Sequence, residues 1–372
     1  MGGRKIPAIF LNLALIPATL LLCVTGFEIA LRVFSISKPS SSHPLKVDPD
    51  NRIALIPNSQ ELYHTSEFTF TVSANKFGRR DHEWSSEQIQ DPENIVFIGD
   101  SFVMGYGVSD QDTIPSLLET LFGEHGKHLE VFNFGIGGSV ALPEYKALLE
   151  KALHMGIKAR TVLVGIFLGN DFSEVGQPAT KSRLPDNGPA PHDEAVLRSE
   201  MSLVNFLHHL RIFYFFRDNI SSSPQLVALM LRIGNLLNVK TYDSSAAFLF
   251  QKTYPDALLK QLNDYLSYLT QMRWMCDKLG YSISFVLFPN KIQVENYADL
   301  KVLDTTDPES PNKLILSFCK AHGLSCLDTL PILLDARKSE PGTILYFPED
   351  RHFTPRGNQL SAKKIYRFLQ MK

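Results

Sequence analysis

The amino-acid sequence predicts an α/β fold built on a doubly wound parallel sheet of about five strands flanked by helices. The apolar run at 95–98 ends in turn residues and has the length of a strand covered on both faces, and further strands are predicted at 129–134 and 161–168. Segments with helical character separate these strands, and the connections are short. This alternation of strand and helix favours a parallel sheet.

An uncharged segment opens the chain. Residues 6–27 carry no charge, and as a helix these 22 residues would be about 33 Å long at roughly 1.5 Å per residue, enough to cross a bilayer core. Arg4 and Lys5 precede the segment, so the positive-inside rule places the amino terminus in the cytoplasm and the rest of the chain outside it. We therefore expect residues 1–34 to form a single-pass anchor in the cell inner membrane, with a periplasmic domain. A cleaved signal peptide is the alternative.

A linker and a short strand region are expected over residues 35–93. Residues 35–60 are rich in Ser, Pro and Asp, which is typical of an exposed linker. Residues 68–73 alternate between apolar and polar side chains, the pattern of a half-buried strand. The following turn, 75–80, ends in two arginines that we expect to be solvated; contact with an anionic ligand is the alternative.

The main domain is expected to span residues 94–372. It contains an insertion at about 172–250, a polar loop followed by an apolar, aromatic helical stretch that we expect to pack on the core; a lid or a membrane contact is the alternative. Further strands are predicted at 283–288 and 324–327, and helices at 113–122, 142–155, 255–279, 311–322 and from 355 to near the carboxyl end.

Charge and cysteine content exclude several classes of protein. The 37 basic and 39 acidic residues nearly balance and form no basic block, which argues against a nucleic-acid partner. The four cysteines form no C-x-x-C pair, so no zinc or redox motif is present. Cys319 and Cys326 are close enough in sequence to pair in an oxidising compartment; two free buried thiols are the alternative.

Polar residues stand where several predicted strands end. Ser101 follows the first strand, a glycine-rich turn at 133–139 follows the second, and Asn170 follows the third, while His352 lies two residues before the predicted last helix. A histidine oriented by a carboxylate can remove the proton that makes a serine hydroxyl a poor nucleophile. Asp350 or Glu349 could orient His352. Backbone N–H groups of Ser101 and of the glycine-rich turn, with the amide of Asn170, could stabilise an oxyanion.

These segments resemble, in order, the blocks of the SGNH or GDSL-type hydrolases, a family named for a Ser, a Gly, an Asn and a His on separate blocks. Gly99-Asp100-Ser101 resembles the first block, and 133–139, 169–171 and 350–352 resemble the other three. The resemblance covers about residues 94–372 and implies a flavodoxin-like, three-layer fold. The predicted anchor with a Phe-Gly-Arg turn after it resembles membrane-anchored bacterial members.

The resemblance also implies site residues. The family's oxyanion glycine lies five residues after the block's Asn, which selects Gly138, with Gly137 and Gly135 as alternatives. The commoner Asp-x-x-His spacing of the last block would select Glu349. The Asp-x-His spacing is similar to acetylation-type relatives, including proteins that acetylate alginate, and we select Asp350.

The sequence therefore predicts a membrane-anchored serine ester hydrolase that acts through an acyl-enzyme. Ser101, His352 and Asp350 are the expected catalytic residues, and Ser101, Gly138 and Asn170 the expected oxyanion hole. The resemblance implies small acyl esters, such as acylated envelope carbohydrate or lipid, as substrates, and no cofactor or metal. An O-acyltransferase using the same site and a non-catalytic envelope scaffold are the alternatives.

Overall fold

The computed structural model describes residues 8–34, 45–47, 53–65, 67–137, 141–172, 175, 247–302, 304–348 and 350–371. The chain divides into two compact units. One consists of Met1–Ser41 and Asn187–Ser223, and the other of Ser42–Asp186 and Pro224–Lys372. Almost all of the predicted insertion, including the aromatic helical stretch at 196–238, lies outside the described residues.

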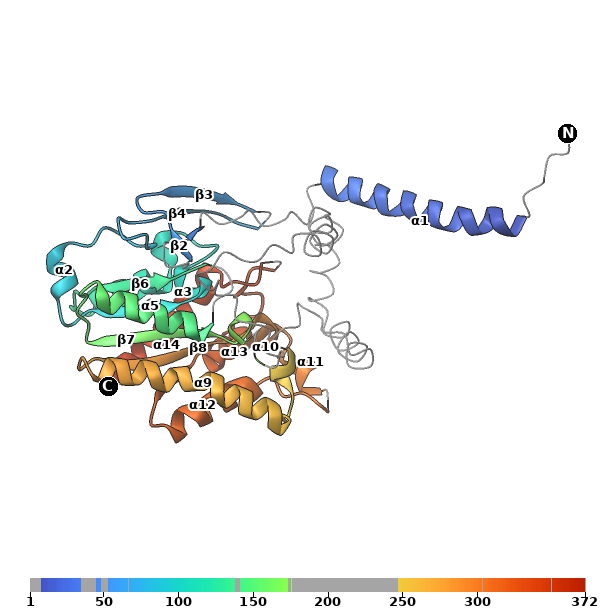
Figure 1. The fold of residues 1–372 in the computed structure, drawn as a ribbon. Helices are drawn as coiled ribbons and strands as arrows, with labels where there is room; N and C mark the ends of the chain where they lie inside the picture. The colour runs from blue at the N-terminus through green and yellow to red at the C-terminus, as the bar shows by residue number, and fades with distance from the viewer. Residues whose placement is uncertain are drawn as a thin grey trace, which may run out of the picture. The chain divides into compact units, whose positions relative to one another are not determined.

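The larger unit is built on a five-stranded sheet with the order β6-β5-β7-β8-β9. Figure 1 labels β6, β7 and β8 of this sheet. Every pair of neighbouring strands in it is parallel. The chain runs from β5 outward to β6 and then returns to the other side of β5 for β7, so the direction of winding changes at β5 and β7. Open parallel sheets bind ligands at the carboxyl ends of strands at such a switch point. The strands are β5 (Ile95–Gly99), β6 (Val131–Gly135), β7 (Thr161–Phe167), β8 (Ser282–Phe288) and β9 (Ser325–Asp328).

Helices cover both faces of this sheet, as the sequence predicts. On one face, Val96 and Ile98 of β5 pack in a core with α5, α9 and α12. On the other face, Ile95 and Phe97 pack with α3, α4, α13 and α14. Successive residues of a strand point to opposite faces, so an unbroken apolar run is what a sheet between two helical layers requires. These helices are α3 (Ser101–Met104), α4 (Ile114–Glu124), α5 (Leu142–His154), α9 (Asp256–Asp277), α12 (Ser310–Ala321), α13 (Leu330–Ser339) and α14 (Pro355–Gln370).

Capping residues fix the helices that border the candidate site. Thr113 caps α4 by accepting the N–H of Ser116, with a proline in the first turn. Thr354 caps α14 in the same way by accepting the N–H of Gly357, and Pro355 follows it. Such caps satisfy N–H groups that the helix itself leaves without acceptors. Shorter elements are α2 (Ser86–Gln90), η1 (Asp110–Asp112), η2 (Asn170–Phe172), η3 (Ala247–Phe250), α10 (Lys291–Glu295) and α11 (Tyr297–Val302).

Residues before the sheet form two antiparallel hairpins. β1 (Leu45–Val47) pairs with β2 (Ile53–Leu55), and β3 (Gln60–His64) pairs with β4 (Thr69–Ser73). The sequence predicts β4 but misses β3, because Gln60–His64 lacks the alternation of apolar and polar side chains. The hairpin of β3 and β4 lies in the same compact unit as the sheet.

The prediction of a solvated arginine pair after β4 is wrong. Arg79 is 1% exposed and Arg80 is 2% exposed. The Arg79 guanidinium lies over the ring of Phe134 at 4.5 Å from its centre. Arg80 binds backbone carbonyls and the carboxylate of Asp110. The ring of Phe134 lies against the Arg79 guanidinium, and carbonyls with the Asp110 carboxylate bind that of Arg80, contacts that the sequence pattern of the turn does not reveal.

The first helix, α1, spans Ala8–Val33. It continues beyond residue 27, where the uncharged segment of the sequence ends. Its last turns contain Glu28 and Arg32, which form an ion pair at 2.7 Å. Among the helices of the described residues, none is both long enough and apolar enough to cross a membrane. No helix in the described part of the chain thus matches the predicted transmembrane anchor.

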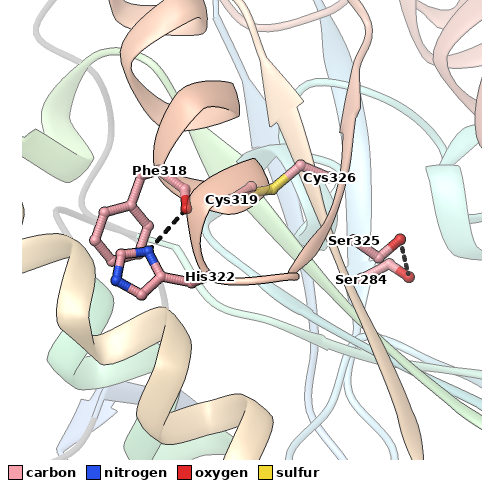
Figure 2. Close-up of a disulfide and its surroundings, with 6 residues drawn as sticks. All are labelled: Ser284, Phe318, Cys319, His322, Ser325 and Cys326. Atoms are coloured by element: carbon pink, nitrogen blue, oxygen red, sulfur yellow. Dashed lines mark hydrogen bonds between the residues drawn. A yellow bond between two sulfur atoms is a disulfide. The ribbon is translucent and has the colours of Figure 1, made fainter.

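A disulfide joins Cys319 of α12 to Cys326 of β9 (Figure 2). The sequence leaves pairing and free thiols open at these two positions, and the structure has the pair. Beside it, Ser325 of β9 accepts a hydrogen bond from Ser284 of β8 at 3.4 Å. The disulfide closes the loop between α12 and the edge strand β9. Cys276 is a buried free thiol.

Candidate active site

Ser101 lies at the start of α3, directly after the carboxyl end of β5. Ser101 is 8% exposed. Its carbonyl accepts the N–H groups of both Gly105 and Tyr106 at 2.9 Å, which closes the short helix. Gly105 adopts a left-handed conformation with φ 87°, a conformation that favours glycine. The turn from strand to helix thus holds the serine at the edge of the sheet.

Two glycines let α3 approach the strand ends closely. A Cβ atom on Gly135, at the end of β6, would lie 2.1 Å from the backbone nitrogen of Met104. A Cβ atom on Gly99 would lie 2.3 Å from a methyl group of Val103. Larger residues at either position would push α3, and with it Ser101, away from the sheet.

His352 lies on the loop between Tyr346 and Phe353, just before α14. Tyr346 and Phe353 pair as an isolated antiparallel bridge. Within the loop, the N–H of Phe347 donates to the carbonyl of His352 at 2.8 Å, and the N–H of Arg351 donates to that of Phe347 at 3.1 Å. The loop is therefore a small, internally bonded hairpin.

The structure brings Ser101, His352 and Asp350 together although the serine and the histidine are 251 positions apart. Ser101 Oγ lies 2.6 Å from His352 Nε2. His352 Nδ1 lies 2.5 Å from Asp350 Oδ1. The same carboxylate oxygen accepts the backbone N–H of His352 at 3.3 Å. This linear arrangement of hydroxyl, imidazole and carboxylate is the geometry by which a serine is activated as a nucleophile. Glu349, the alternative carboxylate, lies outside the described residues.

Charges around the imidazole favour its protonated form. Burial by itself would lower the pKa of His352, but the charge of Asp350, the hydrogen bond to Asp350 and the charge of Asp100 outweigh it and raise this pKa above the ordinary value of 6.5. Asp350 also selects the tautomer, because a proton on Nδ1 leaves Nε2 free to accept the proton of Ser101. The site therefore holds a base of raised basicity beside a hydroxyl group.

Asp100 is a second carboxylate close to this group. It is fully buried and caps α3, since its Oδ1 accepts the N–H of Phe102 at 2.9 Å. Its Oδ2 has no hydrogen-bond partner among the described residues. Burial raises the pKa of Asp100 to about 6, while the Phe102 N–H and the charge of His352 act in the opposite direction. The charge of Asp100 thus links this carboxylate electrostatically to His352.

The three expected oxyanion donors are described to different extents. The N–H of Ser101 is at the amino end of α3, next to its own Oγ. Gly138 and the side chain of Asn170 lie outside the described residues, although the backbone of Asn170 opens η2 directly after β7. The N–H of Gly135, one alternative to Gly138, already donates to Asn133 Oδ1 at 2.9 Å. Gly135 is therefore the weaker candidate, and Gly137 and Gly138 stay open.

A group of titratable side chains lies at the amino end of β6, away from Ser101. Among the described residues, His82, Glu119 and Glu130 form one set whose ligand atoms lie within 4.8 Å of one another. His82 is held from both sides, by Asp81 at Nδ1 and by Glu130 at Nε2, each at 3.0 Å. The hydrogen bonds to Asp81 and Glu130 raise the pKa of His82 to about 10. A protonated His82 between the carboxylates of Asp81 and Glu130 accounts for these contacts.

Two contributors to the site are missed by the sequence patterns. Glu67, in the turn between β3 and β4, accepts the backbone N–H of Asp350 at 2.6 Å. Arg80 binds the carbonyls of Gly105 and Val108, on the segment that follows Ser101. Both lie in the stretch before the sheet, where the sequence shows only a linker, a strand and a turn. The adjacent charges of Arg79 and Arg80, close after a half-buried strand, are a signal that could have pointed to a buried role for Arg80.

Comparisons with known proteins give fold-level matches alone. No protein-family model matches the chain, and no curated protein matches it. Among solved structures, a member of the lipolytic protein G-D-S-L family from Veillonella parvula aligns at 11% identity over 75% of this chain and 100% of that chain, with a TM-score of 0.40. A carbohydrate acetylesterase family member from Sinorhizobium meliloti aligns at 10% identity over 75% and 98% of the two chains, with a TM-score of 0.39. A catalytic mutant of an acetylxylan esterase from Geobacillus stearothermophilus aligns at 11% identity over 75% and 95%, also with a TM-score of 0.39.

Proposed function

We propose that this protein is a serine ester hydrolase that works through an acyl-enzyme. The observation that carries the proposal is the contact chain from Ser101 Oγ to His352 Nε2 and from His352 Nδ1 to Asp350 Oδ1, at 2.6 and 2.5 Å. It lies at the carboxyl end of β5, beside the switch point of the sheet. We assign Ser101 as nucleophile, His352 as general base and then acid, and Asp350 as the group that orients the imidazole.

In the first half-reaction, Ser101 Oγ attacks the ester carbonyl carbon and its proton moves to His352 Nε2. The negative charge that forms on the carbonyl oxygen is stabilised by the N–H of Ser101, by a glycine N–H assigned to Gly138 and by the amide of Asn170. When the carbon–oxygen bond to the alcohol breaks, His352 returns the proton to the departing oxygen. The products are a free alcohol and an acyl group on Ser101.

In the second half-reaction, water attacks the acyl carbon and gives a proton to His352 Nε2. The bond to Ser101 Oγ then breaks, the proton returns to Oγ, and the carboxylic acid leaves. The raised pKa of His352 favours its role as base, because an imidazolium of higher pKa is formed more readily during attack. Every proton that moves in this cycle is carried by Nε2.

We further propose small acyl esters as substrates, including acylated carbohydrate or lipid of the cell envelope. The neighbours that align with this chain include proteins described as a carbohydrate acetylesterase family member and an acetylxylan esterase. We also propose a location outside the cytoplasm, in the periplasm. The Cys319–Cys326 disulfide supports it, because such bonds persist in oxidising compartments.

Hydrolysis of 4-nitrophenyl esters of increasing acyl length tests the proposal. We expect the full chain to release nitrophenol, fastest with the shortest acyl groups, and the Ser101→Ala variant to show no turnover above the solvent rate. Product that forms only when a sugar acceptor is supplied would replace the hydrolase by an O-acyltransferase with the same residues. If the wild-type protein and Ser101→Ala show the same turnover with every ester and acceptor, the result would favour the non-catalytic scaffold.

A further inference from the structure

The turn of the β3–β4 hairpin contacts the loop that carries the candidate base. Glu67 Oε2 accepts the backbone N–H of Asp350 at 2.6 Å, across 283 positions of sequence. A carboxylate accepting an N–H is a charge-assisted hydrogen bond, shorter and stronger than one between neutral groups. This contact holds the residue whose side chain orients His352.

The position of Glu67 is itself fixed by its turn. Thr65 Oγ1 accepts the N–H groups of Glu67 and Phe68, at 3.2 and 3.1 Å. The backbone N–H of Thr65 donates to the carbonyl of Phe68 at 2.9 Å, and the strands on both sides are paired in register. A side chain on such a closed turn loses less freedom on forming its contact than one on an open loop.

Aromatic contacts dock the hairpin against both sides of the site. The ring of Phe68 lies 4.5 Å from that of Phe347, whose backbone bonds to His352. Phe68 also meets Tyr106 edge-on at 5.7 Å, and Tyr106 lies 4.8 Å from the ring of His352. The hairpin therefore touches the loop of the candidate base and the segment that follows the candidate nucleophile.

Arg80 ties the same hairpin to the serine side. Its Nη2 donates to the carbonyl of Thr71 in β4 at 3.0 Å and to that of Val108 at 2.6 Å. Its Nη1 donates to the carbonyl of Gly105, one turn after Ser101. A movement of the hairpin relative to α3 would break these bonds of a buried guanidinium, which is costly.

The histidine loop needs such support. Arg351, between Asp350 and His352, adopts the left-handed conformation with φ 76°, which is unfavourable for a residue with a Cβ atom. Contacts around the residue must hold it in this conformation, and Glu67 acts on its immediate neighbour. Lys291 of α10 supplies a second contact by donating to the carbonyl of Pro348 at 2.6 Å.

We infer that Glu67 is a positioning residue for Asp350, so that the β3–β4 hairpin is a functional part of the active site. The inference rests on the proposed function, because it assigns Glu67 a role through Asp350 and His352. Glu67 touches no reacting atom. Its role is to keep the carboxylate of Asp350 aligned with His352 Nδ1, and misalignment of about 1 Å in a catalytic group can cost about 10²-fold in rate.

Three variants of the full chain test the inference with an ester that the wild-type protein hydrolyses. Glu67→Ala removes the acceptor, and Glu67→Gln keeps a carbonyl oxygen that can accept the Asp350 N–H. Glu61→Ala is the matched control, because Glu61 is exposed on β3 of the same hairpin. Because a misplacement of about 1 Å can cost about 10²-fold in rate, we expect kcat of Glu67→Ala to fall by up to about that factor with little change in KM. Glu67→Gln is expected to recover most of kcat, and Glu61→Ala to match the wild type.

The outcomes separate this inference from the proposed function. If Ser101→Ala is inactive while Glu67→Ala keeps the wild-type kcat, the proposed function stands and the inference is overturned. A loss in Glu67→Ala that Glu67→Gln does not restore overturns it as well, since the acceptor is then not what matters. If Ser101→Ala is as active as the wild type, the proposed function is wrong, and the role of Glu67 that rests on it is overturned as well. Thermal unfolding of each variant serves as the structural readout; a kcat loss in Glu67→Ala at an unchanged midpoint supports positioning.

Discussion

The candidate nucleophile and the candidate base are held in place by different kinds of interaction. Ser101 is fixed by packing: α3 lies against Gly99 and Gly135 so closely that no larger side chain fits. His352 is fixed by polar contacts, since its loop is bonded internally and held by Glu67 and Lys291. His352 and Asp350 are also more exposed than Ser101, since both are half-buried and Ser101 is buried.

This difference predicts how each side responds to mutation. Close packing is shared with the hydrophobic core, so a defect on the serine side should lower the free energy of unfolding. Hydrogen bonds at a partly exposed loop contribute little to global stability but determine geometry. A defect on the histidine side should therefore lower kcat and leave the fold intact.

The largest effect is expected from Asp350→Asn on the histidine side. The amide keeps the shape of the side chain but favours the wrong tautomer of His352, and an equivalent change in a serine protease lowers kcat by about 10⁴-fold. Steady-state kinetics would measure the loss, and thermal unfolding should show little change. Glu349→Gln is the control, with turnover close to that of the wild type. A larger loss in Glu349→Gln than in Asp350→Asn would transfer the orienting role to Glu349.

Asn170→Ala is expected to have the next largest effect. Asn170 follows β7, the strand beside β5, and loss of one oxyanion donor typically lowers kcat by about 10²- to 10³-fold. Because the amide acts on the transition state, KM should change much less than kcat. A loss below about threefold in kcat would remove Asn170 from the oxyanion hole that we propose.

Gly135→Ala tests whether close packing against the sheet holds Ser101 in place. The added methyl group would lie 2.1 Å from the backbone of α3, so the helix must move. Overpacking of this kind costs about 1–3 kcal/mol in the free energy of unfolding, which urea denaturation would measure. Gly123→Ala in α4, where a Cβ meets nothing within 4 Å, is the matched control and should not destabilise. A Gly135→Ala protein with wild-type stability would contradict the view that packing fixes Ser101.

Asp100→Asn is the mildest change and links the two sides through charge. The base must be neutral to accept a proton, so the acid limb of kcat/KM should lie above pH 6.5 in the wild type, because the pKa of His352 is raised. The charge of Asp100 contributes to that rise, so Asp100→Asn should move the limb to lower pH. The Asn side chain can still cap α3. An unchanged limb in this variant would show that Asp100 does not act on His352.

The same variant makes a prediction about stability and pH. The pKa of Asp100 is raised by burial from 3.8 to about 6, so the folded state prefers its protonated form. This preference stabilises the fold fully below pH 3.8 and is lost as the pH rises through about 6. Asp100→Asn removes this dependence, and at pH 8 its free energy of unfolding should be no lower than that of the wild type.

The contrast between the two sides also explains what the sequence could predict. Short-range patterns reveal the sheet, because apolar runs such as 95–98 and the caps Thr113 and Thr354 leave a local signal. Ser101 and Asn170 could likewise be predicted as site residues because each follows a predicted strand, and His352 because it lies just before a predicted helix. Glu67 leaves no such signal, since its partner is a backbone group far away in the chain. The strand β3 is missed because its pairing with β4, and not its own pattern, makes it a strand.

Covalent labelling with a fluorophosphonate, followed by mass spectrometric mapping, tests the central claim most directly. The reagent reacts with a serine only where a base activates the hydroxyl and donors stabilise the developing oxyanion. We predict a single adduct on Ser101 in the full-length protein, and its loss in His352→Ala. An adduct on another serine, or labelling of Ser101 at an equal rate in His352→Ala, would contradict the account.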